Sequence, residues 1–165
     1  MIRQGMIRNG ECLIEESLAC GDCWSDIVQD LLAEGLNDEE IASLLRSQDA
    51  WAMDARRMKA DGFPYEEMVF YLTTMRATWA DIGRALMSAG VSPADMLRTV
   101  LPFTEGEDHW PLVQAGLLDG PEDADYAEVR GVLGFCFLNE EELLQSLDVD
   151  ETQRDRVVQR LGIQD

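Results

Sequence analysis

Residues 24–45 read WSDIVQDLLAEGLNDEEIASLL, and the same pattern returns at 51–72 as WAMDARRMKADGFPYEEMVFYL and at 79–101 as WADIGRALMSAGVSPADMLRTVL. In each copy a glycine follows the leading tryptophan by eleven positions, and an apolar residue follows that glycine by six. Repeats of this length are typical of stacked supersecondary units, because a single unit cannot bury its own apolar face. The three copies therefore predict a repeat architecture.

A fourth, diverged copy is expected near the end of the sequence. Tyr126 replaces the tryptophan there, Phe137 replaces the glycine, and the segment LNEEE at 138–142 aligns with LNDEE at 36–40. Trp110 opens a shorter degenerate unit, WPLVQAGLLDG, which we expect as an insert over 105–122. We predict a single domain over 1–165, with repeat-like units near 24–47, 51–74, 79–101 and 126–147.

Each copy predicts two short helices. The apolar residues of the first helix recur at the spacing of one helical stripe: Trp24, Ile27, Val28, Leu31 and Leu32. The glycine that follows is typical of a helix end, where the left-handed conformation disfavours a Cβ. Ser92 before Pro93, and Asn37 before three acids, are typical helix starts. We therefore predict an all-α fold of tandem helical hairpins stacked into a compact bundle or short solenoid, with the tryptophans as core anchors.

The Gly35-Leu36 and Glu40-Ile41 pairs also resemble the turn of helix-turn-helix DNA-binding domains, and tandem helix pairs are similar to α-solenoid proteins. These resemblances imply the helical geometry only. The second helices read DEEIASLL and YEEMVFYL, without the Arg or Lys that contacts phosphate or guanine. Direct binding to DNA is not expected.

The charge balance excludes several further classes of function. The chain has 33 acidic and 13 basic residues and a formal net charge of −20, which argues against binding to nucleic acid or to an anionic membrane. The longest apolar run, 132–138, is too short to cross a bilayer, and the opening residues lack the apolar stretch of a secretory signal. We expect a soluble, cytoplasmic protein.

The acids are concentrated at the two ends of the sequence. Residues 1–45 hold ten acids and two bases, residues 46–98 hold seven of each, and residues 99–165 hold sixteen acids and four bases. Two interpretations remain open: a solvated acidic face, or a surface that docks a basic partner by imitating the spacing of phosphates. The candidate partner-binding acids are Glu105, Glu107, Asp108, Asp119, Glu122, Asp123, Asp125, Asp38, Glu39, Glu40, Glu140, Glu141 and Glu142.

The basic run Arg56-Arg57-Met58-Lys59 is expected to pair internally with nearby acids: Asp54, Asp61, and Glu66 or Glu67. Cys20 and Cys23 form a C-x-x-C pair, which leaves three alternatives: buried or incidental thiols, a metal site with Cys12 and a distant ligand such as Cys136 or His109, or redox chemistry. A second C-x-x-C is missing, so no metal and no cofactor are expected.

Signatures of catalysis are sparse. His109 is the single histidine, Lys59 is the single lysine, and the sequence contains no G-x-x-x-x-G-K-[ST] phosphate loop. We therefore predict a protein that is not an enzyme and that binds a basic, nucleic-acid-handling protein and covers its nucleic-acid site. In size and acidity the chain is similar to phage-encoded inhibitors of host defence, including anti-CRISPR proteins.

The alternative prediction is a helical-repeat adaptor or assembly scaffold. It would bind a protein partner through the neutral middle of the chain, where methionines and aromatic residues are frequent. The residues that suggest this surface are Met53, Met58, Met68, Phe70, Tyr71 and Met75. The competing interpretation is that the same residues fill the core between units.

Overall fold

The structure is a computed structural model that describes residues 1–136 and 139–163. Within these ranges it contains eleven α-helices, one short 3-10 helix and no strand, which confirms the all-α prediction. In chain order the elements are α1 (Gln4–Ala19), α2 (Trp24–Ala33), α3 (Asp38–Ser47), α4 (Ala50–Ala60), α5 (Tyr65–Thr74), α6 (Trp79–Ser88), α7 (Pro93–Val100), η1 (Leu101–Thr104), α8 (Trp110–Leu118), α9 (Tyr126–Cys136), α10 (Glu140–Ser146) and α11 (Glu151–Leu161).

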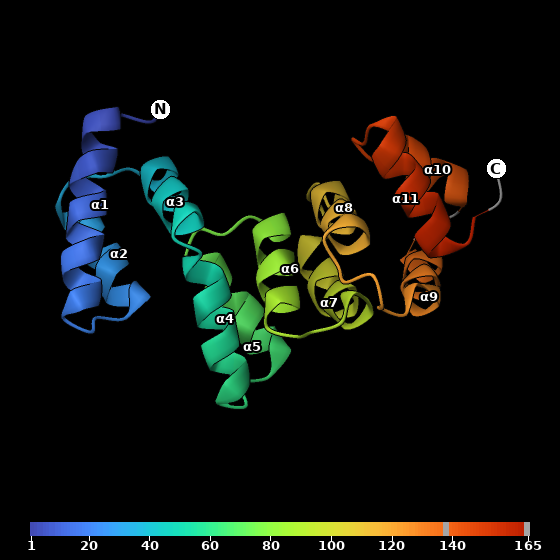
Figure 1. Cartoon of the computed structure of the whole chain (residues 1–165), viewed down its shortest axis with the longest axis horizontal. Helices are drawn as coiled ribbons and strands as arrows, with labels where there is room; N and C mark the ends of the chain where they lie inside the picture. Colours follow the sequence, from blue (N-terminus) through green and yellow to red (C-terminus); the bar gives the residue numbers. More distant parts are fainter. Residues whose placement is uncertain (137–138, 164–165) are drawn as a thin grey trace.

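The helices of the middle of the chain stack in two rows. In one row α4 contacts α6 and α6 contacts α8, and in the other α5 contacts α7 and α7 contacts α9. Helices α1, α2 and α3 form a separate group that meets the stack where α3 contacts α4. Figure 1 shows the consequence, an elongated arch in which the chain advances along the long axis and the termini lie at opposite ends.

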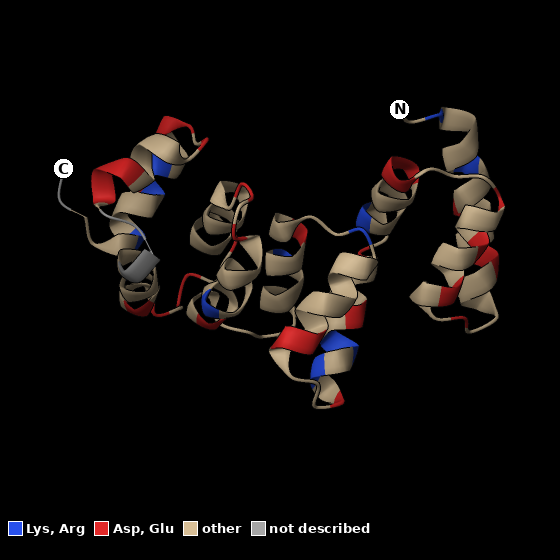
Figure 2. Ribbon diagram, turned by 180° about the vertical axis from the view of Figure 1, so that it is seen from behind, with Lys and Arg blue, Asp and Glu red and all other residues tan. Residues whose placement is uncertain are grey.

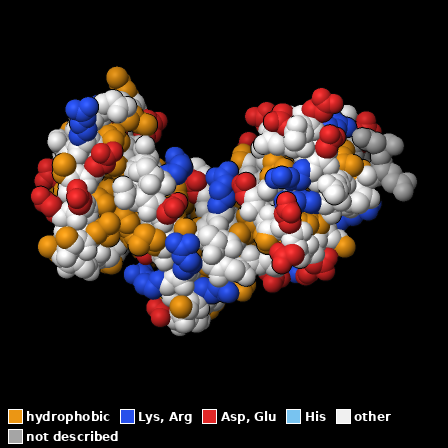
Figure 3. All heavy atoms as spheres, in the orientation of Figure 1, with side chains coloured by type: hydrophobic (Ala, Val, Ile, Leu, Met, Phe, Trp, Pro, Cys, Tyr) orange, Lys and Arg blue, Asp and Glu red, His pale blue; other side chains and the backbone are white. Residues whose placement is uncertain are grey.

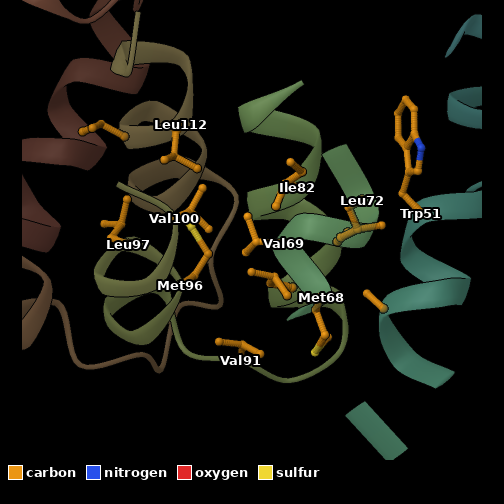
Figure 4. Packing of buried hydrophobic residues seen from close by; sticks show 14 of the residues in the cluster. Trp51, Met68, Val69, Leu72, Ile82, Val91, Met96, Leu97, Val100 and Leu112 are labelled. Atoms are coloured by element: carbon orange, nitrogen blue, oxygen red, sulfur yellow. The ribbon is translucent and has the colours of Figure 1, made fainter. Parts of the chain in front are cut away.

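An apolar core runs continuously through the stacked helices (Figure 4). Met68 on α5, Ile82 on α6 and Met96 on α7 are completely buried, and burial stabilises each such side chain by about 1.5–3 kcal/mol. Two helices of the same row, α6 and α8, also approach closely at Gly83, where an added Cβ would lie 2.9 Å from Leu112 Cδ1 on α8. The close contact explains why a glycine occupies the buried stripe of α6.

The predicted helix starts and ends are largely confirmed. Gly35, Gly62 and Gly90 lie just beyond three first helices with φ of 92°, 84° and 93°, the left-handed conformation that favours glycine. The Ser92 hydroxyl accepts a hydrogen bond from the Asp95 amide at 3.2 Å, directly before Pro93. Local sequence thus sets the boundaries of each hairpin.

Three expectations about packing need correction. Trp24 and Trp51 are core anchors, but Trp79 and Trp110 are only half-buried, and Leu32 is 37% exposed although it belongs to the predicted stripe. Trp79 stays near the surface because its Nε1 donates a hydrogen bond to Glu107 at 2.5 Å.

The expected insert over 105–122 is also placed differently. Its helix, α8, stacks on α6 and contacts α7 and α11, so it takes a regular position in the row. Apolar residues on several sides of this helix permit contacts with all three neighbours: Leu112, Val113, Ala115, Gly116 and Leu117 are buried. Helices α1 and α11 lie outside the predicted units and extend the array at both ends.

Candidate protein-binding surfaces

Ion pairs between helices that are not consecutive in the sequence engage several of the arginines. Arg46 on α3 lies 2.8 Å from Asp81 on α6, Arg84 on α6 lies 2.9 Å from Asp119, and Arg98 on α7 lies 2.6 Å from Glu128 on α9. Such pairs join neighbouring units, and they place positive charge beside carboxylates of the same molecule. The result is that internal contacts neutralise basic groups while most acids remain on the surface.

Glu40 is the clearest exception to the predicted acidic surface. Its carboxylate is fully buried, accepts hydrogen bonds from the Arg3 guanidinium at 2.7 and 3.1 Å, and accepts another from the Asn37 amide at 2.9 Å. These bonds, first of all the one to Arg3, lower the pKa of Glu40 to about 2. Glu40 therefore completes the capping box of α3 and joins α3 to Arg3 near the N-terminus. The prediction that Glu40 binds a partner is wrong, because its carboxylate is buried.

Asp81 plays a similar structural part at the junction of α3 and α6. Burial raises the pKa of this carboxyl, but hydrogen bonds from Arg46 and from Thr78 outweigh burial and lower the pKa below its ordinary range. The Thr78 hydroxyl donates to Asp81 at 2.7 Å and in turn caps the Asp81 amide. One buried carboxylate thus closes a capping box and joins two units.

The predicted cluster of acids between 105 and 125 does not form one free surface. Asp108 accepts a hydrogen bond from the Trp110 amide at 3.1 Å, and Asp125 accepts one from the Glu128 amide at 3.1 Å. Glu107 accepts the hydrogen bond from Trp79, and Asp119 forms the ion pair with Arg84. All seven acids of the segment nevertheless lie at the surface: Glu105, Glu107, Asp108, Asp119, Glu122, Asp123 and Asp125 are exposed.

The acidic helix starts at the two ends are also partly engaged. Asp38 lies 2.7 Å from Arg76, Glu39 lies 2.6 Å from the Met1 nitrogen, and Glu140 pairs with Arg130. Glu141 accepts a hydrogen bond from Gln145, while Glu142 is exposed at the start of α10. Both clusters remain at the surface, apart from Glu40, but they do not converge with the 105–125 segment into one patch.

A further set of exposed acids was missed from the sequence. It lies on the N-terminal helix pair (Figure 2), and we name it the acidic hairpin. Its members are Glu11, Glu15, Glu16, Asp22, Asp26, Asp30 and Glu34, all exposed. The available signal was the i, i+4 spacing of Asp26, Asp30 and Glu34 in a stretch without any base between Arg8 and Arg46.

The acids of α2 stand at an unfavourable end of their helix. Asp30 lies in the last turn and Glu34 caps the C-terminus, and no basic residue accompanies them. Negative charge at a helix C-terminus opposes the helix dipole, and like charges at i, i+4 repel each other. Helix stability therefore does not explain these residues.

A second surface feature is a groove beside α4 and α5, which we name the aromatic groove. Phe63, Phe70 and Phe103 line it and are 44%, 68% and 40% exposed, and the groove encloses about 840 Å³. The exposed acids Asp61, Glu66 and Glu67 stand at its edge. Apolar rings from α5, the turn before it and η1 are thus gathered at one place.

One wall of the aromatic groove is fixed by a buried carboxylate. Tyr71 donates a hydrogen bond from its hydroxyl to Asp54 at 3.0 Å, and Arg57 lies 3.4 Å from the same carboxyl. Burial raises the pKa of Asp54. Burial of the Tyr71 hydroxyl and its contact with the Asp54 carboxylate together raise the pKa of Tyr71 to about 12. The expected pairing of Arg57 with Asp54 is confirmed, and Tyr71 is a neutral phenol held in place.

The methionines proposed for an adaptor surface are mostly in the core. Met58, Met68 and Met75 are buried, which fits the competing core interpretation, whereas Met53 and Phe70 are exposed. Of that predicted set, Phe70, Tyr71 and the buried Met58 line the aromatic groove. The alternative surface is therefore smaller than expected and more aromatic.

The cysteines show no metal site in the described part of the chain. Cys12 and Cys20 are exposed free thiols, and the half-buried Cys23 thiol hydrogen-bonds to Asp26 at 3.1 Å. No group of three metal-ligating His, Cys, Asp or Glu side chains occurs within residues 1–134 and 139–163. The side chain of Cys136 lies outside the described residues.

Two further observations concern the chain as a whole. None of the helices in the described ranges combines the length and the hydropathy that a bilayer crossing requires. Comparison with known proteins returned no match: no protein-family model, no curated protein and no solved structure is similar enough to this chain to indicate a family.

Proposed function

We propose that this protein is a non-enzymatic acidic binding protein that docks on a basic, nucleic-acid-handling protein in the cytoplasm and covers its nucleic-acid site. The observation that carries the proposal is the acidic hairpin. Seven exposed carboxylates occupy residues 11–34, and no basic residue lies among them. Such a surface complements the cationic groove that binds phosphates in a nucleic-acid-handling protein.

The spacing of these carboxylates supports recognition of a phosphate-binding groove. Asp26, Asp30 and Glu34 are four residues apart, which places successive charges about 6 Å apart along a helix that rises 1.5 Å per residue. A helix holds this row rigidly, so little conformational entropy is lost when a partner binds. The hairpin can thus present an ordered series of negative charges, as a nucleic-acid backbone does.

The stability cost of the acidic hairpin is a second support. Asp30 and Glu34 lie at the C-terminal end of α2, where negative charge opposes the helix dipole, and like charges at i, i+4 repel each other. Each such contact weakens the folded state by a few tenths of a kcal/mol. Residues that weaken a fold without a local compensation are typical of binding surfaces. In this proposal the chain is a competitive inhibitor, of the kind that anti-CRISPR proteins represent, and acts by mass action.

The test is capture of partners by wild-type protein and by a variant neutralised in the hairpin, E15Q/D26N/D30N/E34Q. We expect the wild type to capture basic nucleic-acid-binding proteins at low salt and release them steeply as salt rises. Added duplex DNA should compete with capture, and the neutralised variant should lose at least tenfold in affinity for each identified partner.

A matched control carries the same number of neutralised acids on the C-terminal helices: E141Q/D148N/E151Q/D155N. Each of these residues is exposed, so the two variants have the same net charge but a different distribution. Equal losses in both variants would mean that net charge alone drives binding. A partner that holds DNA and this protein together without mutual loss would contradict occlusion.

A second candidate function, the adaptor or assembly scaffold, is favoured by one observation. Phe70 is 68% exposed on a helix whose opposite side is completely buried. An exposed aromatic residue beside two others is typical of a protein-binding surface. Neutralising the acidic hairpin would leave partner capture unchanged under this alternative.

A further inference from the structure

The aromatic groove gathers phenylalanines that are distant in the sequence. Phe63 lies in the turn between α4 and α5, Phe70 lies on α5, and Phe103 lies in η1. The contact of α5 with α7, which leads directly into η1, brings the third ring to the first two. Met58 and Tyr71 complete the lining, so the groove has an apolar floor.

Packing within the fold does not account for Phe70. Met68, Val69 and Leu72 form the buried side of α5, and Phe70 lies two residues, or about 200°, round the helix from Met68. Its neighbours on that exposed side are Glu66 and Thr74, both exposed. A large apolar side chain in the middle of a polar helix face indicates a surface that another molecule covers.

The charge at the edge of the groove restricts what can bind there. Asp61, Glu66 and Glu67 are exposed acids that border it. Among the described residues that line the groove the one base is Arg57, which lies 3.4 Å from the buried Asp54 carboxyl; this pairing reduces its influence. An occupant must therefore bring apolar side chains to the floor and positive charges to the edge.

We propose that the aromatic groove docks an amphipathic helical segment of a partner protein. The segment presents apolar or aromatic side chains at i, i+3 or i+4, and i+7 to the three phenylalanines, and lysines or arginines to the acidic edge. A volume of about 840 Å³ is in the range of pockets that hold several large side chains, about 300–1,000 Å³. Helix-in-groove recognition of this kind relies on a few apolar anchors.

The principal alternative occupant is a second copy of this chain. Self-association would bring together two surfaces that share the same acidic edge, in molecules that each carry a net charge of −20. Electrostatic repulsion opposes that arrangement, whereas a basic helix is attracted. The same edge repels an anionic lipid surface.

This inference is independent of the acidic-hairpin proposal, because it concerns a different surface with a different chemistry, and it specifies the kind of partner that the adaptor alternative would bind. The acidic hairpin lies on α1 and α2, while the groove is formed by α4, α5 and η1. In Figures 1 and 2 the helices α1 and α2 lie at one end of the arch, while α4 and α5 lie in its middle. Either proposal can fail while the other holds.

The experiment uses a displayed library of peptides of about 16 residues, long enough to form a helix. Peptides are selected on the full-length wild-type protein and depleted on Phe70→Ala. We expect the enriched sequences to share apolar anchors at helical spacing and an excess of Lys and Arg. Fluorescence anisotropy of one enriched peptide then measures its affinity for each variant.

We expect Phe70→Ala to weaken peptide binding at least tenfold, because anchors of this kind dominate such interfaces. Met53→Ala is the matched control, since Met53 is 44% exposed but does not line the groove; its affinity should stay within twofold. The E66Q/E67Q variant should weaken binding and reduce its salt dependence. The hairpin variant E15Q/D26N/D30N/E34Q should bind within fivefold of wild type.

Three results would overturn the proposal. One is a library without any peptide whose binding depends on Phe70, and another is a consensus without basic residues. The third is a wild-type dimer that Phe70→Ala converts to a monomer in analytical ultracentrifugation, which would assign the groove to a second copy. Circular dichroism confirms that each variant is folded, and E66K/E67K supplies a second, charge-reversing test at exposed positions.

Discussion

The N-terminal helices α1–α3 and the middle helices α4–α8 are built from the same kind of hairpin, yet their cohesion differs. In the middle, alternate helices stack in two rows around completely buried residues such as Ile82 and Met96. The N-terminal group joins that stack by the contact of α3 with α4 and by ion pairs of Arg46 and Arg76. Figure 3 shows a recess between the end of the molecule that holds α1–α3 and the half that holds the C-terminal helices, with the middle helices α4–α6 below it.

The two regions differ in the kinds of contact that hold them together. Residues 46–98 of the middle hold seven acids and seven bases and contribute to an extensive apolar core, so we expect their stability to depend little on salt or pH. The N-terminal group carries the acidic hairpin, and its attachment uses charged groups. We expect perturbation of the core to affect the whole fold, and perturbation of the charged contacts to affect mainly the N-terminal group.

The largest effect is expected from Ile82→Ala on α6. Ile82 is completely buried in the middle of the stack, and truncation of such a side chain typically costs about 2–5 kcal/mol through lost burial and a residual cavity. Urea denaturation followed by circular dichroism measures the change in free energy of unfolding. Met53→Ala, at an exposed position, should change it by less than about 0.5 kcal/mol. If Ile82→Ala and Met53→Ala lowered the free energy of unfolding equally, the assignment of Ile82 to the core and Met53 to the surface would be contradicted.

A smaller loss, about 1–2 kcal/mol, is expected from Asp81→Asn at the junction of the two regions. The substitution weakens the bond to Arg46 and the capping interaction with Thr78. Hydrogen exchange should show that the amides of α3 and α6 lose more protection than the amides of α7. Asp119→Asn, which removes an exposed ion pair with Arg84, is the control and should cost less than about 1 kcal/mol. Uniform loss of protection along the chain would contradict a local junction.

The pH dependence of the N-terminal group should follow Glu40. Its pKa is lowered to about 2 in the folded state, from an ordinary value of 4.5. A lowered pKa stabilises the fold above the ordinary value, and this contribution disappears as the pH falls from 4.5 toward 2. Glu40→Gln should therefore lower the urea midpoint at pH 7, and the difference from wild type should shrink at pH 3. A difference that is the same at both pH values would exclude this carboxylate as the cause.

The smallest effect is a gain of stability in the acidic hairpin. Asp30→Asn with Glu34→Gln removes two charges from the C-terminal end of α2 and should stabilise the fold by about 0.5 kcal/mol at low salt. The gain should decrease in 1 M salt, where screening extends over only about 3 Å. The measurement is the urea midpoint at both salt concentrations. No gain at low salt would mean that these acids make a compensating contact.

The sequence predicted the hairpins well because their signals are local. The glycines at 35, 62 and 90 and the caps at Asn37 and Ser92 define helix ends through backbone chemistry within a few residues, and the structure confirms them. The completely buried stripe of α2 likewise follows from helical spacing. Fold class and most hairpin boundaries were therefore accessible from periodicity alone.

The surfaces were harder to predict because they depend on contacts between distant residues. The pairing of Glu40 with Arg3 and of Asp119 with Arg84 cannot be read from composition, so a count of acids overestimated the free carboxylates between 105 and 125. The aromatic groove requires Phe103 to meet Phe70 across 33 residues. The local sequence signal for this groove was the position of Phe70 between polar neighbours on α5.

The order of the helix contacts has a consequence for how the chain acquires its structure. Along the stack each helix touches the helices one or two places away in the sequence, as α4 touches α6 and α6 touches α8. Contacts of such short sequence separation favour rapid folding. During synthesis on a ribosome the first hairpins can therefore become native while the later ones are still being made, and each newly exposed apolar face is covered soon after it emerges.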